Sequence, residues 1–292
     1  MPLFDSDFLK KLEYLSLVSR RVFRGQLLAQ RRTMQLGGGI EFADHREYTP
    51  GDDFRYLDWN VFARHDELLL KRFQEEEDLH VYILLDCSQS MAFGAPSKFD
   101  YARQVTAALA YIALADLDRV AVVAFAGGIV ADFPLTRGKG RILSLMKFLE
   151  GLQVRDGLTD LGRSAENFIH RSQRRGLAVV VSDLFDPAGY QRGLDVLRHH
   201  RYEPHVVQVF DRREADPSIK GDVELLDVES RDVEKVTVTE RNLRQYRKIF
   251  DAFLESVGRY CTTYGIGGTR ATTDIPFDDL ILRMMREAGA LT

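Results

Sequence analysis

The sequence has few cysteines and no long apolar run. Only two cysteines, Cys87 and Cys261, occur among the 292 residues, and they form neither a CxxC pair nor a disulfide framework. The longest apolar stretches, 104–115 and 120–131, are shorter than the roughly 18 residues that a membrane span needs. The first eight residues carry acids where a secretory signal has basic residues and then an apolar segment. We therefore expect a soluble protein of the reducing cytoplasm, without a transmembrane segment.

An excess of positive charge is also missing. The 40 Lys and Arg residues are outnumbered by 44 Asp and Glu, which gives a net charge of −4. A domain that coats a nucleic-acid backbone is usually basic, so no nucleic-acid partner is expected. The hydrophobic content of 45% is enough, at this length, to bury a sizeable core.

Residues from about 80 to 210 alternate between apolar strands and amphipathic helices. Segments 81–86, 119–126, 177–183 and 205–211 are apolar and rich in β-branched residues, as is typical of strands buried on both faces. The helices expected between them begin near Ser97, Leu143, Leu161 and Pro187. This alternation predicts a doubly wound α/β fold, in which a mainly parallel sheet carries helices on both faces.

The segments after residue 211 are less regular. Residues 223–239 predict a β-hairpin with a polar turn near 230–232, inside an insertion of about 219–240. A long helix is expected at roughly 241–263, followed by a last strand and a closing helix.

The first 77 residues differ from the rest. Apolar residues between 6 and 31 recur at helical spacing, with seven Lys or Arg between Lys10 and Arg32. Such a helix can lie on a membrane surface, although docking on the body of the protein is the favoured interpretation. In the charged extension that follows, 67–74 is expected to form a strand that hairpins onto 81–86. We therefore divide the chain into an N-terminal helix and charged extension at 1–77 and a main domain at 78–292.

Side chains with oxygen ligands follow the predicted strands where those strands end. They are Asp86, Ser88 and Ser90, then Thr159 and Asp160, and finally Ser182, Asp183 and Asp186. Ligands of open parallel sheets bind outside the carboxyl ends of the strands, so these side chains are expected to lie close together. Carboxylates and hydroxyls without His or Cys are typical of a hard cation rather than of zinc or copper. Because hydroxyls are neutral, an acidic side chain of a partner protein would be a favourable further ligand.

Five of these residues resemble the metal-ion-dependent adhesion site of von Willebrand factor type A domains. In that family an Asp-x-Ser-x-Ser after the first strand works with a Thr and an Asp from two later loops. The resemblance implies that Mg²⁺, or Mn²⁺ or Ca²⁺, is bound by Asp86, Ser88, Ser90, Thr159 and Asp183. Gln89, Asp160 and Asp186 would then lie on the rim that the partner's carboxylate approaches. Gln89 and Leu158 stand where glycine is frequent in the family.

The segment 46–91 resembles a narrower bacterial family, the domain of unknown function 58. It contains a Gly-Asp-Asp-x-Arg-x-x-Asp-Trp run, and in that family such a segment precedes a von Willebrand A-like domain. The resemblance implies association with MoxR-type AAA+ ATPases and their client proteins, and it implies no reaction. The residues of structural or unassigned role are Gly51, Asp52, Asp53, Arg55, Asp58, Trp59 and Arg64.

The function predicted from the sequence is a non-enzymatic, metal-dependent interaction module that serves such an ATPase as an adaptor or co-chaperone. No base accompanies the serines as a nucleophile would require, so no catalytic residue is assigned. One alternative is a metal-dependent phosphatase or nuclease, which would use the same ion or a second centre at Asp52, Asp53 and Asp58. At that second centre, a turn whose acids pair with arginines and cap backbone groups is favoured. The other alternative is a membrane-surface adaptor that binds through the basic N-terminal helix.

Overall fold

The computed structural model describes residues 3–30, 32–36, 41–76, 79–172, 174–227 and 232–290. Its contacts divide the chain into two compact units. The larger unit contains residues 1–19 and 79–288, and the smaller contains 20–78 and 289–292. The first 19 residues therefore belong with the main domain, whereas the sequence analysis places the whole segment 1–77 apart from it.

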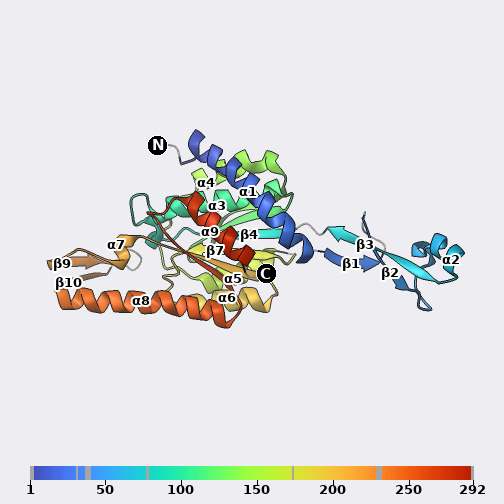
Figure 1. Cartoon of the computed structure of the whole chain (residues 1–292). Coiled ribbons are helices and arrows are strands. Elements are labelled where there is room, and N and C mark those ends of the chain that lie inside the picture. The colour runs from blue at the N-terminus through green and yellow to red at the C-terminus, as the bar shows by residue number, and fades with distance from the viewer. Residues whose placement is uncertain are drawn as a thin grey trace. The chain divides into compact units, whose positions relative to one another are not determined.

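A six-stranded sheet forms the centre of the larger unit (Figure 1). Its strands, in spatial order, are β11 (Gly267–Thr272), β8 (Glu203–Phe210), β7 (Leu177–Ser182), β4 (His80–Asp86), β5 (Arg119–Phe125) and β6 (Ile129–Arg137). Every neighbouring pair is parallel except β5 and β6. Numbered along the chain, this is the 3-2-1-4-5-6 order of doubly wound folds, with the third strand reversed. The predicted α/β fold with a mainly parallel sheet is confirmed.

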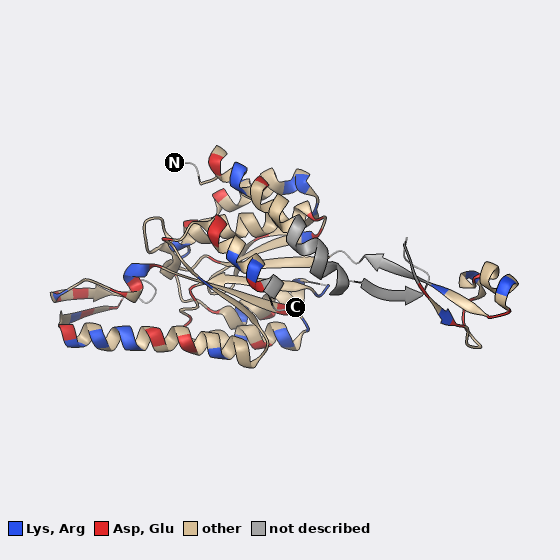
Figure 2. Ribbon diagram, viewed as in Figure 1, with Lys and Arg blue, Asp and Glu red and all other residues tan. Residues whose placement is uncertain are grey.

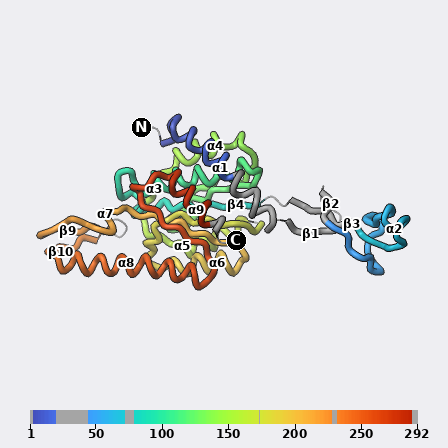
Figure 3. Tube along the Cα trace, viewed as in Figure 1, coloured from blue at the N-terminus to red at the C-terminus, as the bar shows by residue number. Residues whose placement is uncertain are grey.

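Helices cover both faces of the sheet (Figures 1 and 3). One face carries α5 (Leu161–Arg171), α6 (Tyr190–His199) and α8 (Glu240–Thr263), and the other carries α3 (Lys98–Ala115), α4 (Ile142–Gly151) and α9 (Phe277–Ala290). On the first face Tyr82 and Leu84 of β4 pack with Phe168, Leu194 and Val257. Each such side chain stabilises the fold by about 1.5–3 kcal/mol when fully buried.

Strand β4 is buried along its whole length. It pairs with β5 on one edge and with β7 on the other, which satisfies its backbone groups on both sides. The prediction that 67–74 hairpins onto this strand is therefore wrong. Strand β3 (Leu69–Glu76) instead lies between β1 (Arg32–Leu36) and β2 (Glu41–Glu47) in an antiparallel sheet of the smaller unit.

Helix α1 (Ser6–Gln30) begins on the larger unit. Phe8, Leu12 and Leu15 are buried, and the ring of Phe8 lies 4.6 Å from that of Phe277. The Lys11 ammonium pairs with Asp278 at 3.1 Å. Up to Ser19 the favoured interpretation, a helix docked on the protein, is confirmed. Within the described residues no helix is long and apolar enough to cross a membrane.

The predicted hairpin is present as β9 (Gly221–Leu226) and β10 (Val233–Val238), an antiparallel pair. Residues 230 and 231 of its predicted turn lie outside the described residues. The long predicted helix is α8, which carries both acidic and basic side chains along its length, as is typical of a solvent-exposed face (Figure 2).

Helix α6 begins later than predicted. Its first residue is Tyr190, not Pro187. The Asp186 carboxylate accepts a hydrogen bond from the Ala188 N–H, and the Asp186 carbonyl accepts one from the Gly189 N–H. These bonds form a turn that contains Pro187 and delays the helix.

Candidate metal centre

The predicted metal ligands lie where β4 and β7 end and in the loop before α5. Asp86 is the last residue of β4, and Asp183 directly follows β7. Thr159 precedes α5, and the next residue, Asp160, donates its N–H to the carbonyl of Ala126, just after β5. Asp86, Ser88, Thr159 and Asp183 are each at most 4% exposed, and Ser90 is half-buried. The fold thus brings these segments to one edge of the sheet, as expected.

Asp86 is held by hydrogen bonds to both carboxylate oxygens. Oδ1 accepts the Ser88 N–H at 2.8 Å, and Oδ2 accepts the Ser182 hydroxyl at 2.5 Å. Complete burial, and then the nearby negative charge of Asp183, raise the pKa of Asp86 well above its usual range. The ionised form of this carboxylate is therefore disfavoured by its surroundings, and a bound cation would stabilise it.

Two hydroxyls lie beside this carboxylate. Ser88 precedes a short 3-10 helix, η2 (Gln89–Ala92), and its Oγ lies 3.0 Å from that of Ser90. The backbone of Cys87, between Asp86 and Ser88, is held by two hydrogen bonds of 2.7 Å. Its N–H donates to the carbonyl of Phe125, and its carbonyl accepts from the N–H of Arg155. The alternate spacing of the serines thus directs both hydroxyls to one point.

Lys98 is the main feature of the centre that the sequence did not predict. Its side chain is fully buried, and Nζ lies 2.7 Å from Asp183 Oδ2 and 2.5 Å from Glu214 Oε1. The ammonium also lies 5.0 Å from the centre of the Phe185 ring. Burial opposes the charge, but the two carboxylates outweigh it and raise the pKa of Lys98 above its usual value. Lysine is almost never fully buried unless paired, so Lys98 is a resident cation.

One signal in the sequence could have identified this residue. Lys98 is the first residue of α3, directly after the N-cap Ser97. A positive charge in the first turn opposes the helix dipole, so a lysine there needs a negative partner.

Glu214 links the centre to the end of β8. It lies in α7 (Arg212–Ala215), where its Oε2 accepts the N–H of Asp211 at 2.9 Å in a capping box. The Asp211 carboxylate in turn accepts hydrogen bonds from the Arg213 guanidinium and from the Thr273 hydroxyl. The hydrogen bond from Arg213 is the main cause that lowers the pKa of Asp211 to about 2. When all three are ionised, Asp86, Asp183 and Glu214 leave two negative charges beyond the one that Lys98 neutralises.

The side chains of the centre fit a hard divalent cation. Carboxylates and hydroxyls are the ligands that Mg²⁺ prefers, and a charge of +2 equals the excess negative charge. The oxygens of Asp183 are occupied by Lys98 and by the Phe185 N–H at 3.0 Å, so Asp183 would reach the ion through water. No group of three or more His, Cys, Asp or Glu arranged to hold a metal occurs among the described residues, so an ion at this candidate centre would depend on hydroxyl ligands as well.

The predicted rim residues have structural contacts. Asp160 caps α5 by accepting the Arg163 N–H at 2.7 Å. Asp186 accepts the Leu161 N–H at 2.8 Å, which ties the loop after β7 to the start of α5. Gln89 is half-buried in η2, and Leu158 is 56% exposed. The two rim carboxylates thus fix the position of the loop that carries Thr159.

The second acidic cluster forms part of the smaller unit. Asp52 accepts from Thr49 and Arg46, and Asp53 accepts from Arg55 and caps η1 (Phe54–Tyr56). Gly51 adopts a φ of 109°, which favours glycine in this turn. The turn, the backbone cap and the pairing of Asp53 with Arg55 agree with the favoured interpretation, whereas the arginine that pairs with Asp52 is Arg46 and not one of those expected.

Asp58 has a similar role. It caps α2 (Trp59–His65) and lies 3.0 Å from the His45 Nε2, the contact that contributes most to lowering its pKa to about 2. Arg64 lies in the last turn of α2, where a positive charge favours the helix dipole. Trp59 remains 60% exposed.

Comparison with known proteins identifies relatives in bacteria. The uncharacterized protein Rv1480 of Mycobacterium tuberculosis is 27% identical over 230 residues, which cover 77% of this chain and 72% of that protein. The uncharacterized protein YeaD of Bacillus subtilis is 39% identical over 51 residues, 18% of this chain and 13% of that protein. Among solved structures, the conserved hypothetical protein BatB from Bacteroides thetaiotaomicron aligns with 73% of this chain and 100% of its own, at 17% identity and a TM-score of 0.45.

The fold assignment rests on the strand order above, and the family assignment rests on the sequence. The profile of the family described as "protein of unknown function DUF58" matches residues 44–252, well over half of the chain. The protein is therefore a member of the DUF58 family.

Proposed function

We propose that this protein is a non-enzymatic, divalent-cation-dependent protein-interaction module. The observation that supports the proposal is the buried, negatively charged centre at the ends of β4 and β7. Asp183 lies close enough to Asp86 for its charge to raise the pKa of Asp86, and the hydroxyls of Ser88 and Ser90 lie 3.0 Å apart after Asp86. The lysine of the centre is held by two carboxylates, so it is a counter-ion rather than a free base.

In this proposal Ser88, Ser90 and Thr159 would coordinate Mg²⁺ directly, and Asp86 and Asp183 would hold it at least partly through waters. The bound ion would supply a positive coordination position at the sheet edge. Because its direct ligands would be neutral hydroxyls and the carboxylates would act at least partly through waters, a further negatively charged ligand on the ion would be favourable. An Asp or Glu of a partner protein would complete its coordination.

The proposed partner is a MoxR-type AAA+ ATPase, for which the protein would act as an adaptor or co-chaperone towards client complexes. This part of the proposal rests on the family resemblance. The centre has an exposed apolar border at Leu158 and Phe93, which are 56% and 46% exposed. Apolar side chains around a polar anchor are typical of protein interfaces.

The test is recovery of the cognate ATPase on immobilised protein, in Mg²⁺ or in EDTA, with wild type and Asp86→Ala. Recovery is expected only for wild type in Mg²⁺. Asp251→Asn, which changes an exposed carboxylate on α8, is the matched control and should behave as wild type. Equal recovery of wild type and Asp86→Ala with and without Mg²⁺ would contradict the proposal.

A further inference from the structure

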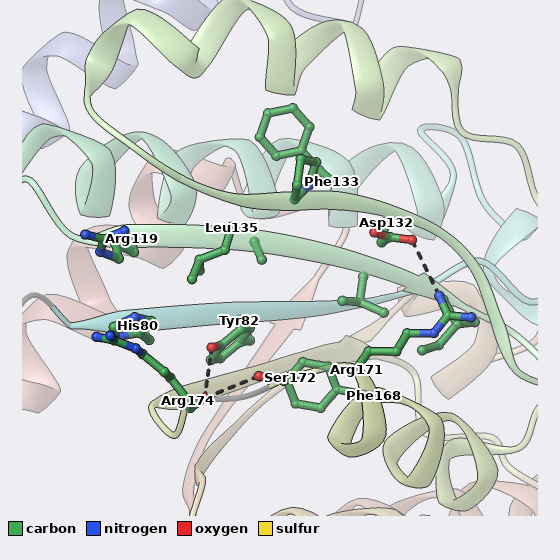
Figure 4. Close-up of a pocket in the computed structure, with 14 residues that line it drawn as sticks. His80, Tyr82, Arg119, Asp132, Phe133, Leu135, Phe168, Arg171, Ser172 and Arg174 are labelled. Carbon is green, nitrogen blue, oxygen red and sulfur yellow. Dashed lines mark hydrogen bonds and ion pairs between the residues drawn. The ribbon is translucent and has the colours of Figure 1, made fainter.

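A pocket separate from the candidate metal centre lies where strand β4 begins. Its volume is about 340 Å³, and its lining comes from β4, β5, β6, α5 and the segment after α5 (Figure 4). His80 lines the pocket, whereas Asp86, at the other end of the same strand, belongs to the candidate metal centre. At about 3.3 Å per residue, the strand separates the two sites by about 20 Å.

The inner wall of the pocket is aromatic and fixed in position. Tyr82 and Phe168 are almost fully buried, and their rings meet edge to face with centroids 5.1 Å apart. The Tyr82 hydroxyl donates to the carbonyl of Arg174 at 2.9 Å, so its polar end is satisfied. Leu135 of the edge strand β6 is 39% exposed and lines the same pocket. These surfaces suit a flat apolar group.

The polar side chains of the pocket are mainly basic. Arg119, Arg171 and Arg174 line it together with His80, and among the described lining residues Asp132 is the single acid. Figure 4 shows Arg119, Arg174 and His80 at one end and the Arg171–Asp132 pair at the other. The whole chain has a net charge of −4, so this excess of positive charge is local.

The ion pair between Arg171 and Asp132, which both line the pocket, is weak. Arg171 and Asp132 are 3.5 Å apart, and their side chains are 61% and 55% exposed. Exposed pairs at such a distance contribute little, so this pair does not prevent an anionic ligand from approaching.

We propose that this pocket binds a small amphipathic anion, a carboxylate or a phosphate attached to a planar apolar body. Guanidinium groups match the paired oxygens of both head groups, and Arg119 and Arg174 stand at the same end of the pocket. The apolar body would lie along Tyr82, Phe168 and Leu135. The volume lies at the lower end of the range of small-molecule sites. This site is independent of the proposed metal centre.

The test uses three probes of one shape: 2-naphthoate, 2-naphthyl phosphate and the neutral 2-naphthylmethanol. Binding to the full chain is measured by ligand-observed NMR and calorimetry in EDTA, which removes any metal-dependent binding. For ligands of this size we expect dissociation constants of about a millimolar or below for at least one anion. The neutral probe should bind at least about fivefold more weakly than that anion, because it forms no ion pair.

Variants then locate the binding site. Arg174→Gln should weaken the binding of the anion by about fivefold. Leu135→Trp should weaken the binding of all three probes, because the larger side chain fills the pocket. Arg175→Gln is the matched control, since Arg175 is the next exposed arginine and does not line the pocket. The proposal is overturned if neither anion binds, if the neutral probe binds as well as the anions, or if Arg175→Gln weakens binding as much as Arg174→Gln.

Discussion

Replacing Lys98 by methionine tests how the candidate metal centre is stabilised. Methionine keeps most of the apolar volume but leaves Asp183 and Glu214 without their ammonium partner. Asp183 is 1% exposed and Glu214 14% exposed at the side chain, so water compensates little. Breaking a buried pair by removing one partner costs about 3–5 kcal/mol. We expect the free energy of unfolding to fall by about that amount in EDTA.

Magnesium should restore part of this loss if the centre binds a cation. Without Lys98 the centre lacks a positive charge beside Asp183, and a bound divalent ion would supply it. We expect the variant to bind Mg²⁺ at least about tenfold more tightly than wild type, which adds about 1.4 kcal/mol to the stabilisation by saturating metal. The prediction is therefore a larger increase in stability with Mg²⁺ for Lys98→Met than for wild type.

The assay is urea denaturation followed by circular dichroism, with Mg²⁺ or EDTA, together with calorimetric titration of Mg²⁺. Lys235→Met is the control, because Lys235 pairs with Glu224 at 2.9 Å on the surface, and its loss should change stability by less than about 0.5 kcal/mol. Adding Glu214→Gln to Lys98→Met should recover part of the stability. A loss below about 1 kcal/mol for Lys98→Met would refute the reasoning about the buried pair. An equal increase in stability with Mg²⁺ for wild type and Lys98→Met would refute the binding of a cation beside Asp183.

Three further predictions concern other parts of the chain. In the folded protein the pKa of Asp211 is lowered to about 2 from 3.8. Its contribution to stability is therefore present above about pH 4 and is lost as the pH falls towards 2. Denaturation at a series of fixed pH values should show a steeper loss of unfolding free energy for wild type than for Asp211→Asn. Leu12→Ala should lower the unfolding free energy by about 2–5 kcal/mol, because Leu12 is fully buried. Leu17→Ala, at a site 63% exposed on the same helix, should change the unfolding free energy by less than about 0.5 kcal/mol. Equal effects of the two substitutions would contradict the docking of α1. Purified protein should show no metal-dependent phosphatase or nuclease turnover, and turnover that Asp53→Ala abolishes but Asp86→Ala retains would favour the hydrolase alternative.

Local patterns explain why much of the fold was predictable. A strand such as β4, buried on both faces, is apolar at its interior positions, and a helix such as α8 must repeat its apolar residues at helical spacing. Both requirements act over a few consecutive residues. They therefore identify the elements and the doubly wound class, although the start of α6 depended on hydrogen bonds of Asp186 that the pattern does not reveal.

Pairing between distant segments was not predictable in the same way. Strand β3 lies at the end of the charged extension and directly precedes β4 in the sequence, so a hairpin was the simplest expectation, yet β4 has parallel partners on both edges. Which strands become neighbours depends on the burial of the whole sheet. The pocket beside His80 illustrates the same point, since its arginines come from β5, from the end of α5 and from the segment after α5.

The candidate metal centre shows what the sequence alone determines and what depends on the tertiary structure. The sequence by itself determined the candidate oxygen ligands, because Asp86, Ser88 and Ser90 have a spacing that one short loop converts into a shared direction. Only the tertiary structure decided the charge of the centre. Lys98 meets Asp183 and Glu214 across 85 and 116 residues of chain, and the desolvation that makes their pairing necessary exists only after the sheet and helices have packed together.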